Sequence, residues 1–217
     1  MAAPETLSRE KRQAILDGAA RIFAARGYEG ASMSAITAAA AVSKGTIYQH
    51  FPGKAALFAA TVARECDRKL AHLFRDLGTT EDIAATLLDI GTRFVAMLTS
   101  DVALSIERIV VSEADRFPEL AEAFFQAGPA RAIATMATYL AAQTHAGRLS
   151  VPDPAFAAEQ FFTMCQTRVV MRARLRLPVA AEEAPRVVAA AVRMFLAVYG
   201  VQEVKKGQGS ALDPLGP

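Results

Sequence analysis

Tryptophan is absent from this chain of 217 residues, cysteine occurs twice, and aromatic residues make up only 7% of it. Cys66 and Cys165 lie far apart, and neither has a partner at the spacing of a metal site or a redox pair. His50, His72 and His145 likewise form no zinc pattern. The sequence therefore predicts buried free thiols and no metal or cofactor, with a regulatory disulfide as the less favoured alternative.

Long apolar runs and common enzyme motifs are also missing. No window reaches the roughly 18 uncharged apolar residues of a membrane span, and residues 1–13 lack the apolar core of a signal peptide. No P-loop, dinucleotide fingerprint or nucleophile constellation is present. We therefore predict a cytoplasmic protein that has no membrane partner and is not an enzyme. The rival class, an all-helical hydrolase or transferase, would need clustered carboxylates or histidines that the sequence does not show.

Strand signals are scarce, whereas alanine is abundant. Hydrophobic residues make up 53% of the chain, and much of the excess over a usual soluble domain is alanine. Long Ala-rich segments without Val-Thr-Tyr clusters or Asn-Gly turns favour helices. The fold class predicted is all-α.

The stretch 32–54 combines two short helices, a tight turn and an exposed polar row, which is the pattern of a helix-turn-helix. Ser32 and Ser43 can cap the two helices, and Ile36 and Ile47 would lie on their inner faces. Because two such short helices must lean on a third, the second helix is pushed outward. The residues that it presents are Lys44, Gly45, Thr46, Tyr48, Gln49 and His50. A donor-rich, acid-free helix N-terminus suits the phosphate-lined major groove of double-stranded DNA.

This stretch resembles the DNA-binding segment of the TetR family of bacterial regulators. The residues that carry the resemblance are Ser32, Ile36, Val42, Ser43, Gly45, Thr46, Ile47, Tyr48, His50, Phe51 and Lys54. The chain departs from the family at Ala41, where glycine is frequent; alanine there would cost about 1 kcal/mol if the turn needs a positive φ.

The resemblance also implies roles for individual residues. It places phosphate contacts at Ser32, Tyr48, His50 and Lys54. It places Lys44, Thr46 and Gln49 at base edges, with Ser43 and Gly45 at the same interface. Lys44 is the best candidate for guanine, whose O6 and N7 are acceptors.

Charge is unevenly spread along the chain. Residues 1–75 hold 11 Lys and Arg against 6 Asp and Glu, whereas residues 76–217 hold 13 against 16. The basic part is the part with the helix-turn-helix pattern, which favours an anionic partner there and a different role for the rest.

Helical periodicity predicts helices in two parts, an N-terminal helix-turn-helix three-helix unit, residues 9–54, and a C-terminal helical domain, residues 55–205. The family resemblance implies that the second part is a ligand-binding and dimerisation domain. Residues 1–8 are expected to form a loose arm, and residues 206–217 have the composition of a disordered tail. One long helix, 54–77, would span both parts and offers a means of passing a signal between them.

Further boundaries follow from capping and breaking residues. Thr80 and Asp101 are expected to cap helices, and residues 118–145 should be helical with a break at Gly128. Another helix is expected over 155–175.

The last predicted helix, 182–204, is apolar nearly all round. Such a helix needs cover on two sides. We expect one side to face its own domain and the other, with Phe195, to pack against a second copy in a four-helix bundle; an internal helix of a monomer is the alternative.

The C-terminal part offers aromatic and Met residues for an apolar cavity, of which we expect about a third to touch a ligand and the rest to be core. The candidates are Phe74, Phe94, Met97, Ile106, Ile109, Phe124, Phe125, Met136, Tyr139, Phe161 and Met164. Arg168, one turn from Arg172, could receive an anionic ligand group, although helix-end cations are the favoured reading.

Residues 108–132 also resemble the C-terminal domain of TetR-type regulators near the AefR group, several of which sit beside efflux genes. Together the two resemblances imply a ligand-responsive repressor that binds a palindromic operator as a homodimer and is released by a small hydrophobic molecule. The alternatives are a regulator of lipid or acyl-CoA metabolism, or an architectural DNA-binding protein without a ligand.

Overall fold

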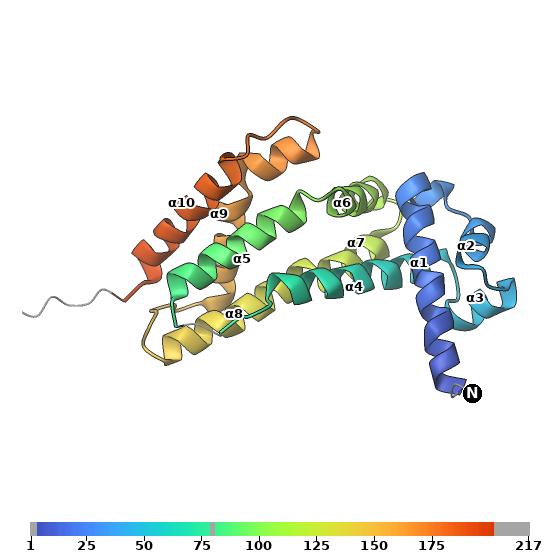
Figure 1. Ribbon diagram of the computed structural model, residues 1–217, viewed down its shortest axis with the longest axis horizontal. Helices are drawn as coiled ribbons and strands as arrows, with labels where there is room; N and C mark the ends of the chain where they lie inside the picture. The colour runs from blue at the N-terminus through green and yellow to red at the C-terminus, as the bar shows by residue number, and fades with distance from the viewer. Residues whose placement is uncertain (1–3, 79–80, 202–217) are drawn as a thin grey trace, which may run out of the picture.

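The computed structural model describes residues 4–78 and 81–201, and side-chain burial from residue 8 onward. Its helices are α1 (Pro4–Gly30), α2 (Met33–Ala40), α3 (Lys44–His50), α4 (Lys54–Leu73), α5 (Ile83–Leu98), α6 (Asp101–Glu113), α7 (Pro118–Ala127), α8 (Pro129–His145), α9 (Pro154–Arg174) and α10 (Glu183–Tyr199). Within these ranges the only β-pairing is an isolated bridge between Leu149 and Gly200. The all-α prediction is confirmed (Figure 1).

Helices α1 to α3 form one end of the molecule (Figure 1). Their apolar faces meet in an N-terminal core that includes Ile15, Ile36 and Ile47. α1 begins at Pro4, so residues 4–8 do not form the loose arm that was predicted. The chain leaves helical geometry at Gly27, whose φ of 68° suits glycine, and the bend leads into α2.

Helix α4 contributes to both cores, as predicted. Leu57 and Phe58 pack in the N-terminal core, whereas Leu70 and Leu73 belong to the larger C-terminal core. Val110 of α6 and Leu120 of α7 also join the N-terminal core. The N-terminal core therefore extends past the predicted boundary near residue 54, because residues of α4, α6 and α7 pack in it.

The C-terminal core is built from α5, α8, α9, α10 and the end of α4. α7 and α8 separate at Gly128, as predicted, and α9 contains a kink at Thr167, which was not predicted. Two of the predicted helix N-caps differ in the structure. Ser100, and not Asp101, caps α6, because its hydroxyl accepts a hydrogen bond from the Ala103 amide. Asp82 caps α5, while Thr80 lies outside the described residues.

α10 ends at Tyr199, earlier than the predicted residue 204, and residues 206–217 lie outside the described part. Phe195 is 1% exposed and packs edge-on against Phe161 within the same chain. The expectation that Phe195 faces a second copy is therefore wrong.

Among residues 4–78 and 81–201, no helix has both the length and the apolar character needed to cross a bilayer.

Candidate DNA-binding interface and ligand cavity

Serine side chains begin both helices of the helix-turn-helix. The Ser32 and Ser43 hydroxyls accept hydrogen bonds from the Ala35 and Thr46 amides, each at 3.1 Å. These bonds satisfy amides that the helices leave unpaired, so both predicted caps are present.

The turn between the two helices depends on Ala41. It adopts φ 52° and ψ 40°, the left-handed region that disfavours a Cβ. In this conformation its amide donates to the Ala38 carbonyl at 3.2 Å. The turn therefore requires a positive φ at the position where the family often has glycine. With alanine there, the left-handed conformation destabilises the turn.

Helix α3 presents the predicted polar row to solvent. Lys44, Gly45 and Gln49 are exposed, and Tyr48 is 45% exposed. Thr46 and His50 are half-buried, while Ile47 on the opposite side is fully buried. The face needed to enter a groove is therefore open.

Lys54 begins α4 directly after the predicted recognition helix. Its Nζ donates to the Tyr28 carbonyl at 2.9 Å and lies 4.4 Å from the centre of the Tyr28 ring. Tyr28 in turn contacts Phe58 edge-on. Lys54 thus anchors α4 to the end of α1, a structural role beside the phosphate contact that the resemblance implies.

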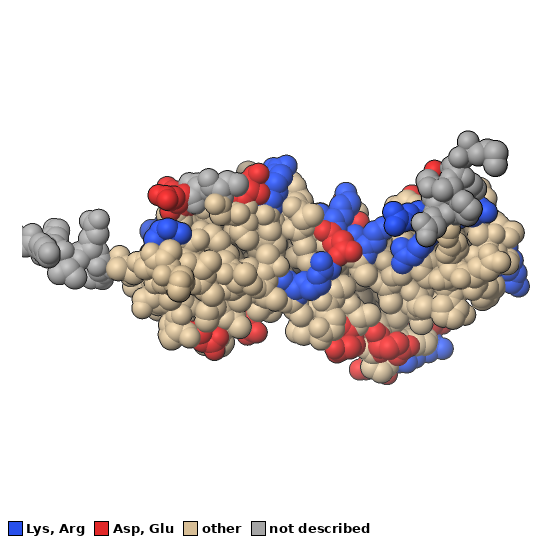
Figure 2. Space-filling model, turned by 90° about the horizontal axis from the view of Figure 1, so that it is seen from below, with Lys and Arg blue, Asp and Glu red and all other residues tan. Residues whose placement is uncertain are grey.

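The electrostatic setting favours DNA. Residues 32–54 contain no Asp or Glu. On the face drawn in Figure 2, the end with α1–α3 shows Lys and Arg, while the larger groups of acidic side chains lie toward the middle and the opposite end. A polyanion approaching α3 would meet little repulsion.

A cavity of about 540 Å³ lies where α4 to α9 meet. That volume is within the usual range for small-molecule sites. Predicted candidates that line it are Phe94, Met97, Ile106, Phe124 and Phe125, joined by Leu70, Leu98, Ile133 and Phe162. The wall is mainly apolar and aromatic.

Seven of the predicted ligand candidates do not line this cavity. Phe74 and Met164 pack against the C-terminal core, and Met136, Tyr139 and Phe161 lie inside it. Ile109 instead packs against the N-terminal core. Those six residues are packing residues in this structure.

Arg168 is the seventh. Its side chain is 61% exposed and pairs with Glu183 at 3.0 Å, and its neighbour Arg172 donates to the Pro178 carbonyl at 2.8 Å. The structure does not bring either arginine to the cavity.

Sequence reasoning missed the charged groups of the cavity, Glu65, Lys69, Glu107, Glu159 and Arg174. Each of these residues has the sequence pattern of an ordinary surface charge on a helix, and their spacing does not indicate that they lie together. Cys66 also lines the wall; burial raises the pKa of its thiol to about 11, helped by Glu65.

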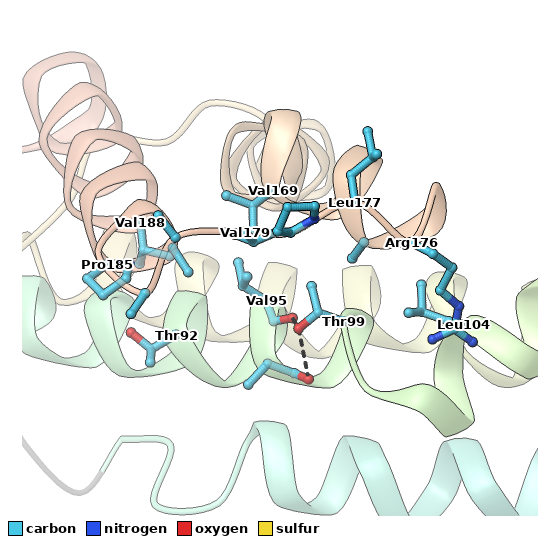
Figure 3. A pocket seen from close by; sticks show the side chains of 16 residues that line it. Thr92, Val95, Thr99, Leu104, Val169, Arg176, Leu177, Val179, Pro185 and Val188 are labelled. Atoms are coloured by element: carbon cyan, nitrogen blue, oxygen red, sulfur yellow. Dashed lines mark hydrogen bonds between the residues drawn. The ribbon is translucent and has the colours of Figure 1, made fainter.

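A second hollow, of about 730 Å³, lies between α5, α9, α10 and the segment 175–182 (Figure 3). Val95, Val169, Val179 and Val188 line it, and Arg176 stands at one end. None of the predicted ligand candidates lines this hollow.

A capped helix-turn-helix on a three-helix unit, joined by a shared helix to a helical domain, defines the class of helix-turn-helix transcription regulators. A sequence profile described as "Bacterial regulatory proteins, tetR family" matches residues 15–61, and one described as "AefR-like transcriptional repressor, C-terminal domain" matches residues 85–201. The chain therefore belongs to the TetR family of transcriptional regulators. Proteins of this family are not enzymes, in agreement with the prediction.

Solved structures of this family resemble the chain over most of its length. A TetR-family regulator from Mesorhizobium loti MAFF303099 is 30% identical, with 89% of this chain and 98% of that one covered and a TM-score of 0.82. The "Flavonoid-responsive Regulator FrrA" is 31% identical, with 88% and 97% covered and a TM-score of 0.75.

Curated relatives match over a shorter stretch. The repressor AcnR of Corynebacterium glutamicum is 41% identical over 78 residues, which are 36% of this chain and 41% of AcnR. The regulator UidR of Escherichia coli K12 is 40% identical over 72 residues, 33% of this chain and 36% of UidR. The chain thus spans about two-fifths of the curated relatives that it matches.

Proposed function

We propose that the chain is a cytoplasmic repressor that binds a palindromic operator as a homodimer and is released when a small hydrophobic molecule enters the 540 Å³ cavity. The observation that carries the DNA-binding part is the exposed, acid-free start of α3, held by the Ser43 cap. Repressor names among the relatives support this direction, although the activator FasR of Mycolicibacterium smegmatis also matches, at 38% identity over 73 residues.

The homodimer is supported by apolar side chains left exposed on α9 and α10. Met194 and Val198, one turn apart, are 52% and 71% exposed, and Met171 and Leu175 are 52% and 61% exposed. Two such rows on helices that pack together suit a four-helix bundle with a second copy. In such a dimer the two α3 helices must enter major grooves about 34 Å apart, or a multiple of it.

The AefR-like domain suggests that the chain controls genes of an efflux system. Control of genes of lipid or acyl-CoA metabolism is the alternative. FrrA is described as flavonoid-responsive, and because flavonoids are aromatic this likeness favours an aromatic effector over an acyl chain. An architectural protein without a ligand is disfavoured by the cavity.

The DNA-binding part is tested by selecting duplex sites from random sequence and titrating salt. With about six phosphate contacts, the slope of log K against log salt should be near −5, because each contact contributes about −0.9. Lys44→Ala should relax sequence choice, whereas Tyr48→Phe, which removes one hydroxyl, should weaken all duplexes alike. A slope near zero, or equal affinity for single strands, would refute the proposal.

A further inference from the structure

Lys69 is one of the polar residues that line the 540 Å³ cavity. The Lys69 side chain is only 17% exposed, and its Nζ donates to the Ser100 hydroxyl at 3.0 Å. A charged ammonium withdrawn from water requires strong acceptors. Burial accordingly lowers the pKa of Lys69, and Glu65 opposes that shift.

Two of the three carboxylates that line the cavity accept hydrogen bonds from an arginine. The nearest, Glu65, forms an ion pair with Nζ at 3.8 Å, and Arg68 donates to both oxygens of the same carboxylate at 2.7 and 3.2 Å. Glu107 is held in the same two-point manner by Arg174, at 2.6 and 3.0 Å. Glu159 sits on the exposed side of α9. Lys69 therefore shares its nearest carboxylate with Arg68, and its ammonium, which has three donors, keeps one for a ligand beside Ser100 and Glu65.

The rest of the wall is aromatic. Phe94, Phe124, Phe125 and Phe162 line the cavity, and Phe94 and Phe162 stand with ring centres 4.5 Å apart. Flat rings fit between such side chains in offset or edge-on contact. With Arg174 paired to Glu107, the Lys69 ammonium and the rings complement a molecule with an apolar aromatic body and one anionic group.

We propose that the cavity binds aromatic molecules that carry a single acidic group, and that the anionic oxygen of the ligand accepts a hydrogen bond from Lys69 Nζ. This inference rests on the proposed function in taking the cavity as the ligand site. It adds the chemical class of the ligand and the residue that selects it. A charge-assisted hydrogen bond in a water-poor site is stronger than a neutral one, so Lys69 distinguishes an acid from its amide.

The contact also has a route to α6. The Ser100 hydroxyl that accepts the hydrogen bond from Lys69 is the cap of α6, and it donates to the Met97 carbonyl at 2.7 Å. α6 then reaches the N-terminal core through Val110. A ligand anion that binds this ammonium therefore acts beside the start of a helix that touches the DNA-binding unit.

The test uses two probes of the same shape, biphenyl-4-carboxylate and biphenyl-4-carboxamide, titrated calorimetrically into the full chain at pH 7. We expect the carboxylate to bind about tenfold more tightly, a difference of about 1.4 kcal/mol. Lys69→Met should remove this preference and leave carboxamide affinity nearly unchanged, and Lys69→Arg should restore it. Arg168→Met, which removes an exposed cation outside the cavity, is the matched control and should keep the preference.

Equal affinities of the wild-type chain for the two probes, or no binding of either, would overturn the inference without any variant having to fold. Persistence of the preference in folded Lys69→Met would do the same. Operator release is measured separately by fluorescence anisotropy of a labelled duplex. If the carboxylate preference holds but the duplex stays bound, the proposed function fails while the assignment of Lys69 stands.

Discussion

Ala41→Gly should stabilise the helix-turn-helix, because Ala41 occupies the left-handed region at φ 52°. An L-residue there costs about 1–2 kcal/mol relative to the right-handed region, and glycine removes most of this cost. Glycine also increases the entropy of the unfolded chain, which offsets about 0.4–1 kcal/mol. The net gain expected is about 0.5–1 kcal/mol.

The assay is urea unfolding followed by far-ultraviolet circular dichroism, since the chain has no tryptophan for fluorescence. In a thermal melt followed by the same signal, the gain corresponds for a chain of this length to a rise in Tm of roughly 1–4 °C. The matched control is Ala38→Gly, the same change at an exposed helical position of α2, which should destabilise by about 1 kcal/mol. If both variants lose stability to a similar extent, the turn does not hold Ala41 in the left-handed conformation and the reasoning fails.

Three further predictions concern packing, assembly and the thiols. Gly18→Ala should cost about 1–3 kcal/mol and weaken operator binding, because its Cβ would lie 2.8 Å from the Ala40 nitrogen; circular dichroism and anisotropy measure the two effects. Val198→Glu should yield monomers in sedimentation, whereas Val111→Glu, at an equally exposed site on α6, should leave the dimer intact. Burial raises the pKa of Cys66 to about 11 and of Cys165 to about 12, so iodoacetamide at pH 8 should alkylate the native chain far more slowly than the unfolded one. Since the unfolded thiols ionise first, the free energy of unfolding should fall above about pH 9 and be unaffected by these groups below it.

The helix-turn-helix could be predicted from the sequence because its determinants are local. Ser32 and Ser43 each cap the helix that follows them, and Ile36 and Ile47 repeat at helical spacing. Capping and periodicity depend on neighbours within one turn, so a short stretch contains the whole signal. The family resemblance covered the same residues.

The cavity could not be predicted in the same detail, because its shape depends on where long helices cross. Phe94 and Met136 have equivalent local patterns, yet one lines the cavity and the other is fully buried in the core. Phe195 was assigned to an interface for the same reason: periodicity gives the apolar stripe of α10 but not which side its own domain covers. No local pattern marked Lys69 as a cavity residue, because its partner Ser100 is far away in the sequence.

The most direct test of the central account is the affinity of the ligand with and without operator DNA. A ligand that releases DNA about 100-fold must prefer the DNA-free state by roughly 2.7 kcal/mol, and linkage requires DNA to weaken ligand binding by the same factor. Calorimetry of biphenyl-4-carboxylate with the free chain, and with the chain saturated by its selected duplex, measures this factor. The account predicts that the duplex weakens ligand binding by the same factor by which the ligand weakens duplex binding. Equal ligand affinities with and without the duplex would contradict it.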